Sequence, residues 1–241
     1  MYRHFTKRLI DIFLSLCGII VLALPMLIIA CVIIISDPGP AFFRQKRVGI
    51  RKDGELTYFS LFKFRSMKMS TPHNVPTHML ENPAQYITKI GAFLRKTSLD
   101  ELPQIINIFM GQMTVIGPRP ALWNQDDLIA ERDKYGANDV KPGLTGWAQV
   151  NGRDELEIAD KARLDGEYAA ALNRGRGFST DWKCFWLTVR AVLKHDGVVE
   201  GGTGELKKEA AAAAAVDAGA DYGKQQVIVY AHESDAEKVL K

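Results

Sequence analysis

The most prominent feature in the pattern of apolar and polar positions is an apolar run near the start of the chain. From Ile12 to Ser36 there are 25 consecutive residues without a charge, and the run ends just before the sequence DPGP. A helix rises about 1.5 Å per residue, so this run exceeds the roughly 30 Å hydrocarbon core of a bilayer. Its length and its bulky end, with no small-residue cleavage site, argue against a cleaved signal peptide. We therefore predict a membrane helix that stays attached.

The charges that flank the run leave two arrangements open. Arg3, Lys7 and Arg8 precede it, and five basic residues follow between positions 44 and 52. A simple span would place one of these flanks on the side of the membrane that basic residues avoid. Pro25, near the middle of the run, removes one helical hydrogen bond and favours a kink. The segment is either a re-entrant helix with both ends in the cytoplasm or an ordinary span that tolerates a proline.

Beyond the apolar run, the pattern predicts a β-hairpin followed by helices. FFRQKRVG and ELTYFSLFKFRSM are rich in aromatic and β-branched residues, and the turn signal Lys52-Asp53-Gly54 separates them. Helices are predicted from about Ser98 to Gly111, over 123–135 and over 180–194, with a loop over 70–82. An alanine-rich helix and one short strand are predicted beyond residue 202.

The predicted helix over 180–194 has an aromatic face with two interpretations. Trp182, Phe185 and Trp186 share this face, whereas Lys183 and Arg190 lie off it. Tryptophans beside lysines are typical of a helix that rests in a membrane interface. A helix packed on a protein core shows the same stripe, so both interpretations stay open.

The composition narrows the classes of function. A chain of 241 residues is long enough for one sizeable core. It contains 31 Lys plus Arg against 28 Asp plus Glu, which gives a net charge of +3. This charge is too small for a protein that coats nucleic acid, and no nucleic-acid partner is predicted. The three cysteines lack CxxC spacing, which argues against a zinc site or a disulfide framework. The sequence contains neither a GxxxxGK[ST] loop nor a GxGxxG motif after a strand, which disfavours the familiar nucleotide-binding folds.

The sequence TSLDELPQ, at positions 97–104, carries two adjacent carboxylates at a predicted helix start. Ser98 and Glu101 have the spacing of a capping box, in which both side chains only satisfy backbone donors. Alternatively, Asp100 and Glu101 lie at the positive end of a helix dipole beside Arg95, which favours a phosphate site. There an aspartate can attack phosphorus, and a neighbouring carboxylate can hold Mg²⁺.

Basic residues recur beside the loops punctuated by glycine and proline. Arginine offers a planar fork that matches phosphate oxygens in pairs, although any single arginine can be a solvated surface charge. The candidates are Arg47, Lys63, Arg65, Arg95, Arg119 and Arg153.

Several motifs occur in an order that resembles a known family. The basic pair KR, then ID and an apolar run with a central proline, are followed by FRQKRVG, FKFRSM, LRKTSLDELPQIINIFMGQMTVIGPRP and VKPGLTGWAQVNGR. This series resembles the monotopic phosphoglycosyl transferases, also called bacterial sugar transferases, over residues 1 to about 200. Leu24 departs from the pattern, because small members often have serine before the proline.

The resemblance implies transfer of a sugar 1-phosphate from a UDP-sugar to polyprenyl (undecaprenyl) phosphate, with release of UMP and a need for Mg²⁺. Asp100 matches the family's nucleophile, which forms an aspartyl-phosphosugar intermediate, and Glu101 matches its Mg²⁺-associated glutamate. Arg95 matches a phosphate-contacting arginine. PRPAL, at positions 118–122, matches the loop linked to uridine binding. Together with the basic residues named above, the set expected to bind substrate is Arg95, Lys63, Arg65, Pro118, Arg119, Pro120 and Arg153.

The resemblance also concerns the membrane. Lys7 and Arg8 match the basic pair at the membrane entrance, and Pro25 matches the break of a re-entrant helix-break-helix. We expect an α/β protein with a small, mostly helical catalytic body and a short β-hairpin, anchored by this helix and by interfacial amphipathic helices. The expected domains are the membrane helix (1–37), the catalytic domain (38–201) and an alanine-rich tail of unknown role (202–241).

The expected location is the cytoplasmic face of a bacterial inner membrane, in contact with its lipids. Two other functions compete with this prediction: a UDP-sugar glycosyltransferase that releases UDP, and a non-catalytic membrane-anchored scaffold. The sequence leaves homo-oligomerisation, the identity of the UDP-sugar and the glycan pathway undetermined.

Overall fold

The computed structural model describes residues 2–71, 83–152 and 156–193. The chain divides into a unit over residues 1–201 and a unit over residues 202–241. All described elements belong to the first unit. The predictions for the tail, and most of the predicted loop over 70–82, lie outside the described residues.

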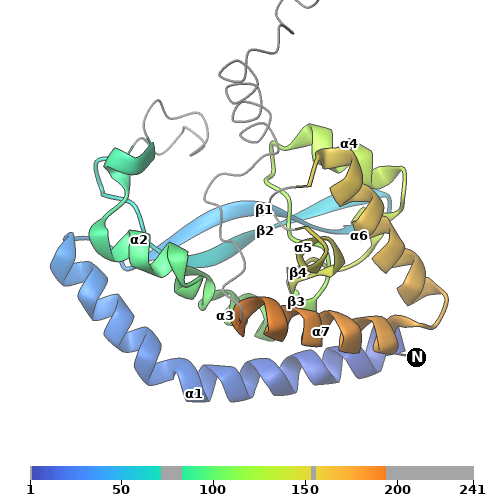
Figure 1. Cartoon of the computed structure of the whole chain (residues 1–241), viewed down its shortest axis with the longest axis horizontal. Helices are drawn as coiled ribbons and strands as arrows, with labels where there is room; N and C mark the ends of the chain where they lie inside the picture. Colours follow the sequence, from blue (N-terminus) through green and yellow to red (C-terminus); the bar gives the residue numbers. More distant parts are fainter. Residues whose placement is uncertain (1, 72–82, 153–155, 194–241) are drawn as a thin grey trace, which may run out of the picture. The chain divides into compact units, whose positions relative to one another are not determined.

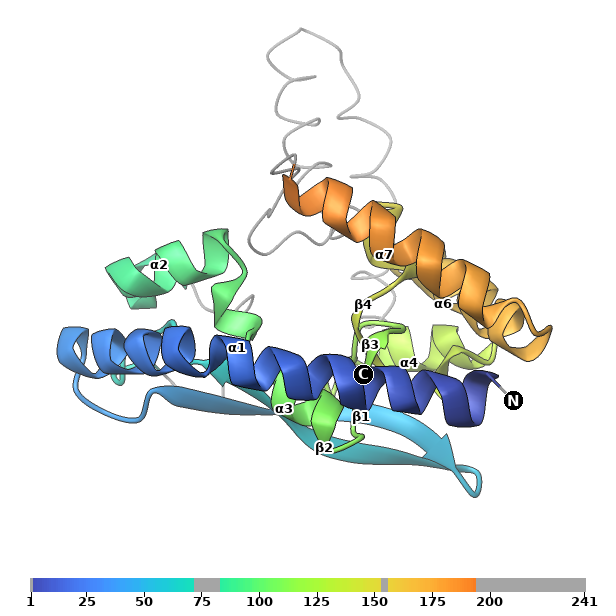
Figure 2. The same cartoon turned by 90° about the horizontal axis from the view of Figure 1, so that it is seen from below.

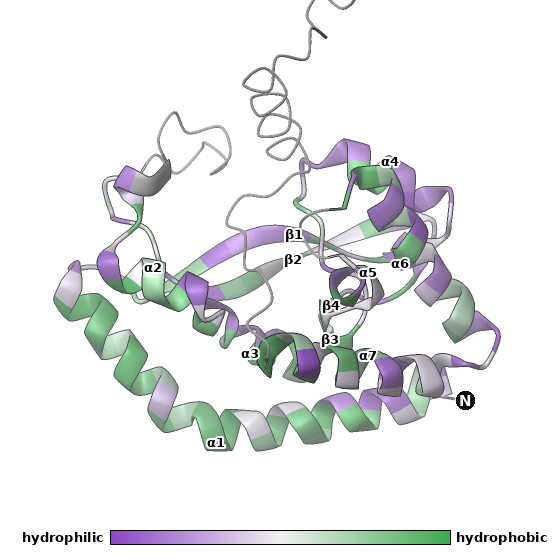
Figure 3. Cartoon of the chain, in the orientation of Figure 1, coloured by the Kyte–Doolittle hydropathy of each residue, from purple (hydrophilic) through white to green (hydrophobic). Residues whose placement is uncertain are grey.

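The apolar run forms one helix, α1 (Lys7–Ser36), after a π-helical turn, η1 (Tyr2–Thr6). By its length and composition α1 is apolar enough to cross a membrane, and only 6% of its most apolar 18-residue window is buried. Figure 3 shows this apolar character along most of the helix. The helix continues through Pro25, so the expected break is not observed in α1, although Figure 1 shows a bend along its length. Proline removes one backbone hydrogen bond, and those of the neighbouring turns remain.

A polar stripe on α1 faces the rest of the unit. Lys7, Asp11 and Ser15 are one turn apart and are buried, in contrast to most of the helix. Gly18 continues the stripe, and a Cβ atom there would lie 2.2 Å from Cδ1 of Ile105. The α1 backbone therefore packs directly on α3 (Gln104–Phe109), as Figure 2 also shows.

The other end of α1 packs on the same unit. Ile33 is buried in a cluster that includes Phe64 and Leu94. Asp37, the residue after the helix, forms an ion pair with Arg65, in which Oδ2 lies 3.1 Å from Nη1. The two ends of α1 therefore contact one body.

The predicted β-hairpin is confirmed. β1 (Phe42–Lys52) pairs antiparallel with β2 (Glu55–Phe64), with Lys52 opposite Glu55. The turn residues Asp53 and Gly54 have φ angles of 51° and 84°. Two-residue hairpin turns need such left-handed backbone angles, which an Asp-Gly pair adopts readily.

A second sheet was not expected from the sequence pattern. β3 (Thr114–Ile116) and β4 (Gly143–Thr145) are parallel strands of three residues, too short to show an alternating pattern. A Cβ atom on Gly143 would lie 2.1 Å from the backbone nitrogen of Gly117. This close approach accounts for glycine in both IGPRP and KPGLTG.

The remaining helices surround these two sheets. The predicted helix over 123–135 is present as the shorter α4 (Asp126–Asp133), followed by η5 (Ala137–Asp139). The sequence pattern did not predict α2 (Lys89–Lys96), α5 (Trp147–Val150) or α6 (Ile158–Asn173), because α2 and α5 are short and the buried face of α6 includes Asp165 and Gly166. The 3-10 turn η3 (Pro83–Tyr86) precedes α2.

The predicted C-terminal amphipathic helix is confirmed as α7 (Gly177–Leu193). Its buried stripe consists of Gly177, Asp181 and Cys184, whereas Trp182 and Trp186 are 57% and 52% exposed. The interpretation in which the aromatic face packs on a core formed by the described residues is therefore wrong. The helix buries its small and polar residues and leaves its aromatic residues outside.

Candidate active site

The carboxylate pair lies in a 3-10 turn, η4 (Leu99–Glu101), rather than in the first turn of a longer helix. Ser98 has a φ angle of 57° and its side chain makes no capping hydrogen bond, so the capping-box interpretation is wrong. An N-cap residue needs extended backbone angles, which the left-handed Ser98 does not have. The helix α3 begins only at Gln104 and has six residues. A long helix dipole therefore does not act on these carboxylates.

Glu101 is clamped between two cations. Nζ of Lys63, on β2, donates to Oε1 at 2.9 Å, and Nη1 of Arg119 donates to Oε2 at 3.1 Å, while Nη2 of Arg119 contacts Oε1. Burial alone would raise the pKa of Glu101, but Arg119 and Lys63 outweigh burial and hold this pKa below its ordinary value. Glu101 is ionised at neutral pH and fixes both cations in place.

Asp100 is in a different state from its neighbour. Its side chain is buried, and it forms no hydrogen bond or ion pair with the described residues. Burial raises the pKa of Asp100 above its ordinary value, with partial opposition from Lys63 and other nearby cations. A poorly solvated carboxylate without a fixed partner is a stronger base and a better nucleophile than an exposed one.

Further cations surround the pair. Nη1 of Arg47, on β1, donates to the backbone oxygen of Pro120 at 2.9 Å, and burial together with the charge of Arg119 lowers the pKa of Arg47 to about 9. Nε of Arg95, on α2, donates to Oγ of Ser66 at 2.9 Å, and its charge partly offsets the rise that burial causes in the pKa of Asp100. These groups bring positive charge around Asp100 and Glu101 from separate elements, as an anionic substrate requires.

Other residues singled out in the sequence lie elsewhere or serve the backbone. Arg65 pairs with Asp37 instead of the carboxylates, and Arg153 lies outside the described residues. The oxygen of Pro118 accepts from the Gly143 nitrogen at 2.8 Å, which fixes the IGPRP loop on β4.

The expected membrane residues have interior contacts at the start of α1. Lys7 is buried and pairs with Asp181 at 2.5 Å. Nη1 and Nη2 of Arg8 donate to the backbone oxygens of Ile108 and Phe109 at 2.7 and 2.8 Å. Pro25 lies within α1.

The sequence pattern did not single out three buried polar residues, Gln104, Asp11 and Asp181. Gln104 follows Asp100 by one turn, is 1% exposed, and its Nε2 has no partner among the described residues. Asp11 directly precedes the apolar run, and Asp181 lies within the aromatic C-terminal helix. An acidic residue next to a membrane segment was the available signal for Asp11.

The donor set is compatible with magnesium that is completed by a substrate. The described residues contain no group of three or more His, Cys, Asp or Glu side chains placed to hold a metal ion. Mg²⁺ is commonly held by one or two carboxylates together with substrate phosphates, and Glu101 supplies one such carboxylate. Any bound magnesium would have to share Glu101 with Lys63 and Arg119.

Comparison with known proteins gives consistent matches. The sequence model of the bacterial sugar transferase family matches residues 2–195. The UDP-glucose:undecaprenyl-phosphate glucose-1-phosphate transferase of Escherichia coli K12 is 38% identical over 76% of this chain, which spans 39% of that relative. The undecaprenyl-phosphate galactose phosphotransferase of Salmonella typhimurium is 32% identical over 80% of this chain and 42% of its own length. The uncharacterized sugar transferase EpsL of Bacillus subtilis is 35% identical, over 80% of this chain and 89% of its own.

Proposed function

Because the chain belongs to the bacterial sugar transferase family, we propose that it transfers a sugar 1-phosphate from a UDP-sugar to undecaprenyl phosphate and releases UMP. The names of the Escherichia coli and Salmonella relatives describe such transfers to undecaprenyl phosphate. The cations gathered around Asp100 and Glu101 suit a diphosphate substrate. The reaction would be the first membrane step in the assembly of a glycan.

The observation that carries this proposal is the contrast between the two adjacent carboxylates. Glu101 is clamped by Lys63 and Arg119, whereas Asp100 keeps its oxygens free of the described residues. In the proposed first step, an oxygen of Asp100 attacks the sugar-bearing phosphorus and the bond to the bridging oxygen breaks. UMP leaves with that oxygen, and Asp100 holds the phosphosugar as an acyl phosphate.

In the second step, an oxygen of undecaprenyl phosphate attacks the same phosphorus. The bond between phosphorus and Asp100 breaks, which restores the carboxylate and gives the lipid diphosphate sugar. Lys63 and Arg119 would orient the diphosphate and stabilise the charge that develops on it. Magnesium bound at Glu101 would add neutralisation of the phosphate charge.

For the membrane arrangement, we propose that α1 enters the cytoplasmic leaflet without crossing the bilayer. Lys7 at one end pairs with Asp181, and Asp37 at the other end pairs with Arg65 on the same body. A helix that crossed roughly 30 Å of hydrocarbon would place these ends on opposite sides and break one set of contacts. The exposed Trp182 and Trp186 on α7 would rest at the headgroup level beside it.

The decisive test is the nucleotide product. Purified full-length protein, with undecaprenyl phosphate and Mg²⁺, is incubated with a panel of UDP-sugars, and UMP and UDP are separated by chromatography. UMP release from at least one donor supports the proposal. Release of UDP would indicate a glycosyltransferase, and no release from any donor would favour the non-catalytic scaffold.

A further inference from the structure

The membrane helix α1 contacts both halves of the candidate active site through side chains one turn apart. One half consists of η4, which carries Asp100 and Glu101, and α3, which follows η4 in the chain. The other half is β3 with the loop that follows it, which carries Arg119. Arg8 contacts the first half, and Asp11 contacts the second.

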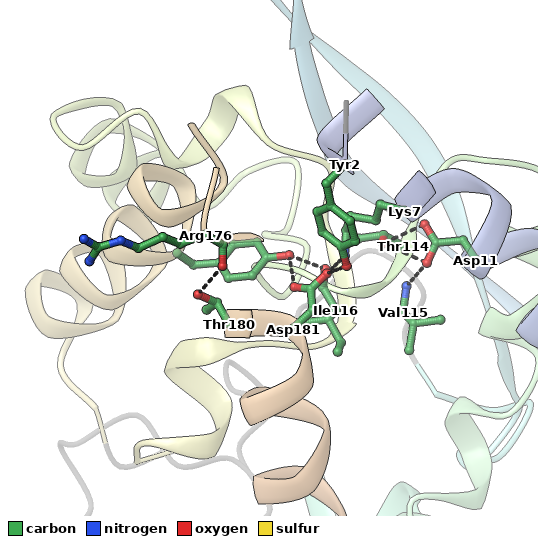
Figure 4. Close-up of polar contacts among 10 residues, drawn as sticks. Tyr2, Lys7, Asp11, Thr114, Val115, Ile116, Arg176, Thr180 and Asp181 are labelled. Carbon is green, nitrogen blue, oxygen red and sulfur yellow. Dashed lines mark hydrogen bonds and ion pairs between the residues drawn. The ribbon is translucent and has the colours of Figure 1, made fainter. Parts of the chain in front are cut away.

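Asp11 binds the edge of β3 that does not pair with β4. Its Oδ1 and Oδ2 accept from Oγ1 of Thr114 at 2.9 and 2.7 Å, and Oδ1 also accepts from the nitrogen of Val115 at 2.9 Å (Figure 4). Asp11 is 3% exposed and Thr114 is 1% exposed, so water does not compete for these bonds. The carboxylate therefore fixes both the side chain and the backbone of this strand.

The third residue of β3 is held by the same buried network. The hydroxyl of Tyr168, on α6, lies 2.8 Å from the oxygen of Ile116 and 2.8 Å from Oδ1 of Asp181. Asp181 in turn accepts from Lys7, one turn before Asp11 on α1 (Figure 4). Arg119 follows Ile116 by three residues, so the position of β3 sets the origin of the loop that clamps Glu101.

The contact with the other half is made by Arg8 and Gly18. Arg8 donates to two carbonyls at the end of α3, which stabilises the last turn of that helix. Gly18 brings the α1 backbone onto Ile105 in the middle of α3. The helix that enters the membrane thus sets the spacing between the carboxylates and the arginine loop.

We infer that Asp11 is a positioning residue: it acts through Arg119, and it couples docking of the membrane helix to the geometry of the diphosphate site. This inference rests on the proposed function. A structural role alone would predict that loss of Asp11 lowers the amount of folded protein. The positioning role predicts a change in the affinity for the nucleotide sugar that depends on Arg119.

The test is a double-mutant cycle between position 11 and position 119, measured by UMP release from full-length protein in detergent micelles. Asp11→Ala should raise KM for the UDP-sugar by about tenfold, with a smaller change in kcat. In the Arg119→Lys background, the same change should add less than about threefold, because the residue through which it acts is already impaired. Asp11→Asn retains an oxygen for Val115 and Thr114, so it should rescue most of the wild-type KM.

Ser15→Ala is the matched control. Ser15 is also buried on the polar stripe, but among the described residues its hydroxyl donates only to the backbone oxygens of Asp11 and Ile12 in its own helix. The KM of Ser15→Ala for the UDP-sugar should stay within about twofold of the wild-type value. If Asp11→Ala does not fold, Thr114→Val removes the same side-chain bond from the strand and takes its place in the cycle.

A second measurement does not depend on turnover. Hydrogen–deuterium exchange of peptides that cover 114–121 should be faster in Asp11→Ala than in Ser15→Ala, because the Val115 amide loses its acceptor. Unchanged exchange in this segment, or effects of positions 11 and 119 on KM that simply multiply, would overturn the inference. The proposed function fails separately, because in that case wild-type protein releases no UMP.

Discussion

Asp100→Asn and Glu101→Gln are nearly isosteric changes of adjacent residues, and the structure predicts opposite effects on stability. The Asp100 carboxylate is buried without a partner among the described residues, and burial raises its pKa. An acid whose pKa is raised by folding destabilises the folded protein at every pH where it is ionised. Removing that charge should leave the free energy of unfolding unchanged or slightly higher at pH 7.

Glu101→Gln removes the partner of two cations. Breaking a fully buried ion pair costs about 3–5 kcal/mol, because the remaining charge stays buried. The Lys63 side chain is 16% exposed but the Arg119 side chain is 39% exposed, so solvent screens part of this cost. We expect a loss of about 2 kcal/mol, which corresponds to a decrease in Tm of roughly 4–8 °C for a unit of this size.

The assay combines thermal unfolding with turnover in one detergent. Asp100→Asn should keep or raise Tm while UMP release falls by about a thousandfold or more, because the amide is no nucleophile. Incubation of wild type with UDP-sugar alone should give a phosphosugar adduct on the peptide that contains Asp100. Glu55→Gln, an exposed residue at the hairpin turn, serves as control and should change neither quantity. The reasoning is refuted if Asp100→Asn turns over normally or loses as much Tm as Glu101→Gln.

Four further predictions follow from the same contacts. Arg119→Lys and Arg95→Lys keep the charge but lose the fork, so each should reduce kcat/KM by about tenfold or more; near-normal kinetics in both would make them surface charges. The acid limb of the pH profile of kcat/KM should lie above the ordinary pKa of aspartate, because attack requires ionised Asp100 and burial raises its pKa; a profile limited at the ordinary value would contradict this. In a cysteine-free background, single cysteines at positions 3 and 51 should both react only from the cytoplasmic side; labelling of position 3 from the periplasm would establish a spanning helix. Lipids brominated on their acyl chains should quench tryptophan fluorescence, and the quenched component should disappear when Trp182 and Trp186 are both changed to Phe.

Local patterns were sufficient for the hairpin, α1 and α7, because each element has a signal within its own sequence. The turn Asp53-Gly54 and the long apolar run are such signals. The prediction of a capping box was wrong because Ser98, in the connection between α2 and η4, adopts a left-handed backbone conformation. Three-residue strands such as β3 carry no periodicity, so they were not predicted.

The carboxylate pair and Arg119 were identified from sequence, but their different states were not. Whether a carboxylate is clamped or unpaired depends on Lys63, which precedes Glu101 by 38 residues and comes from another element. The contact between Asp11 and Thr114 joins residues 103 positions apart. Such contacts are fixed by tertiary packing, and without related sequences no local rule reveals them.

The buried polar stripe on α1 has a physical consequence for how the helix is held. Apolar contacts are non-directional, so a uniformly apolar helix could rotate or slide along the body at little cost. A shift of one residue moves each side chain by about 1.5 Å along the axis and 100° around it. Such a shift would break all three hydrogen bonds of Asp11 and the ion pair of Lys7, and leave both charges buried without partners. These two charges therefore select one register for α1, which buried apolar residues of the same size would not do.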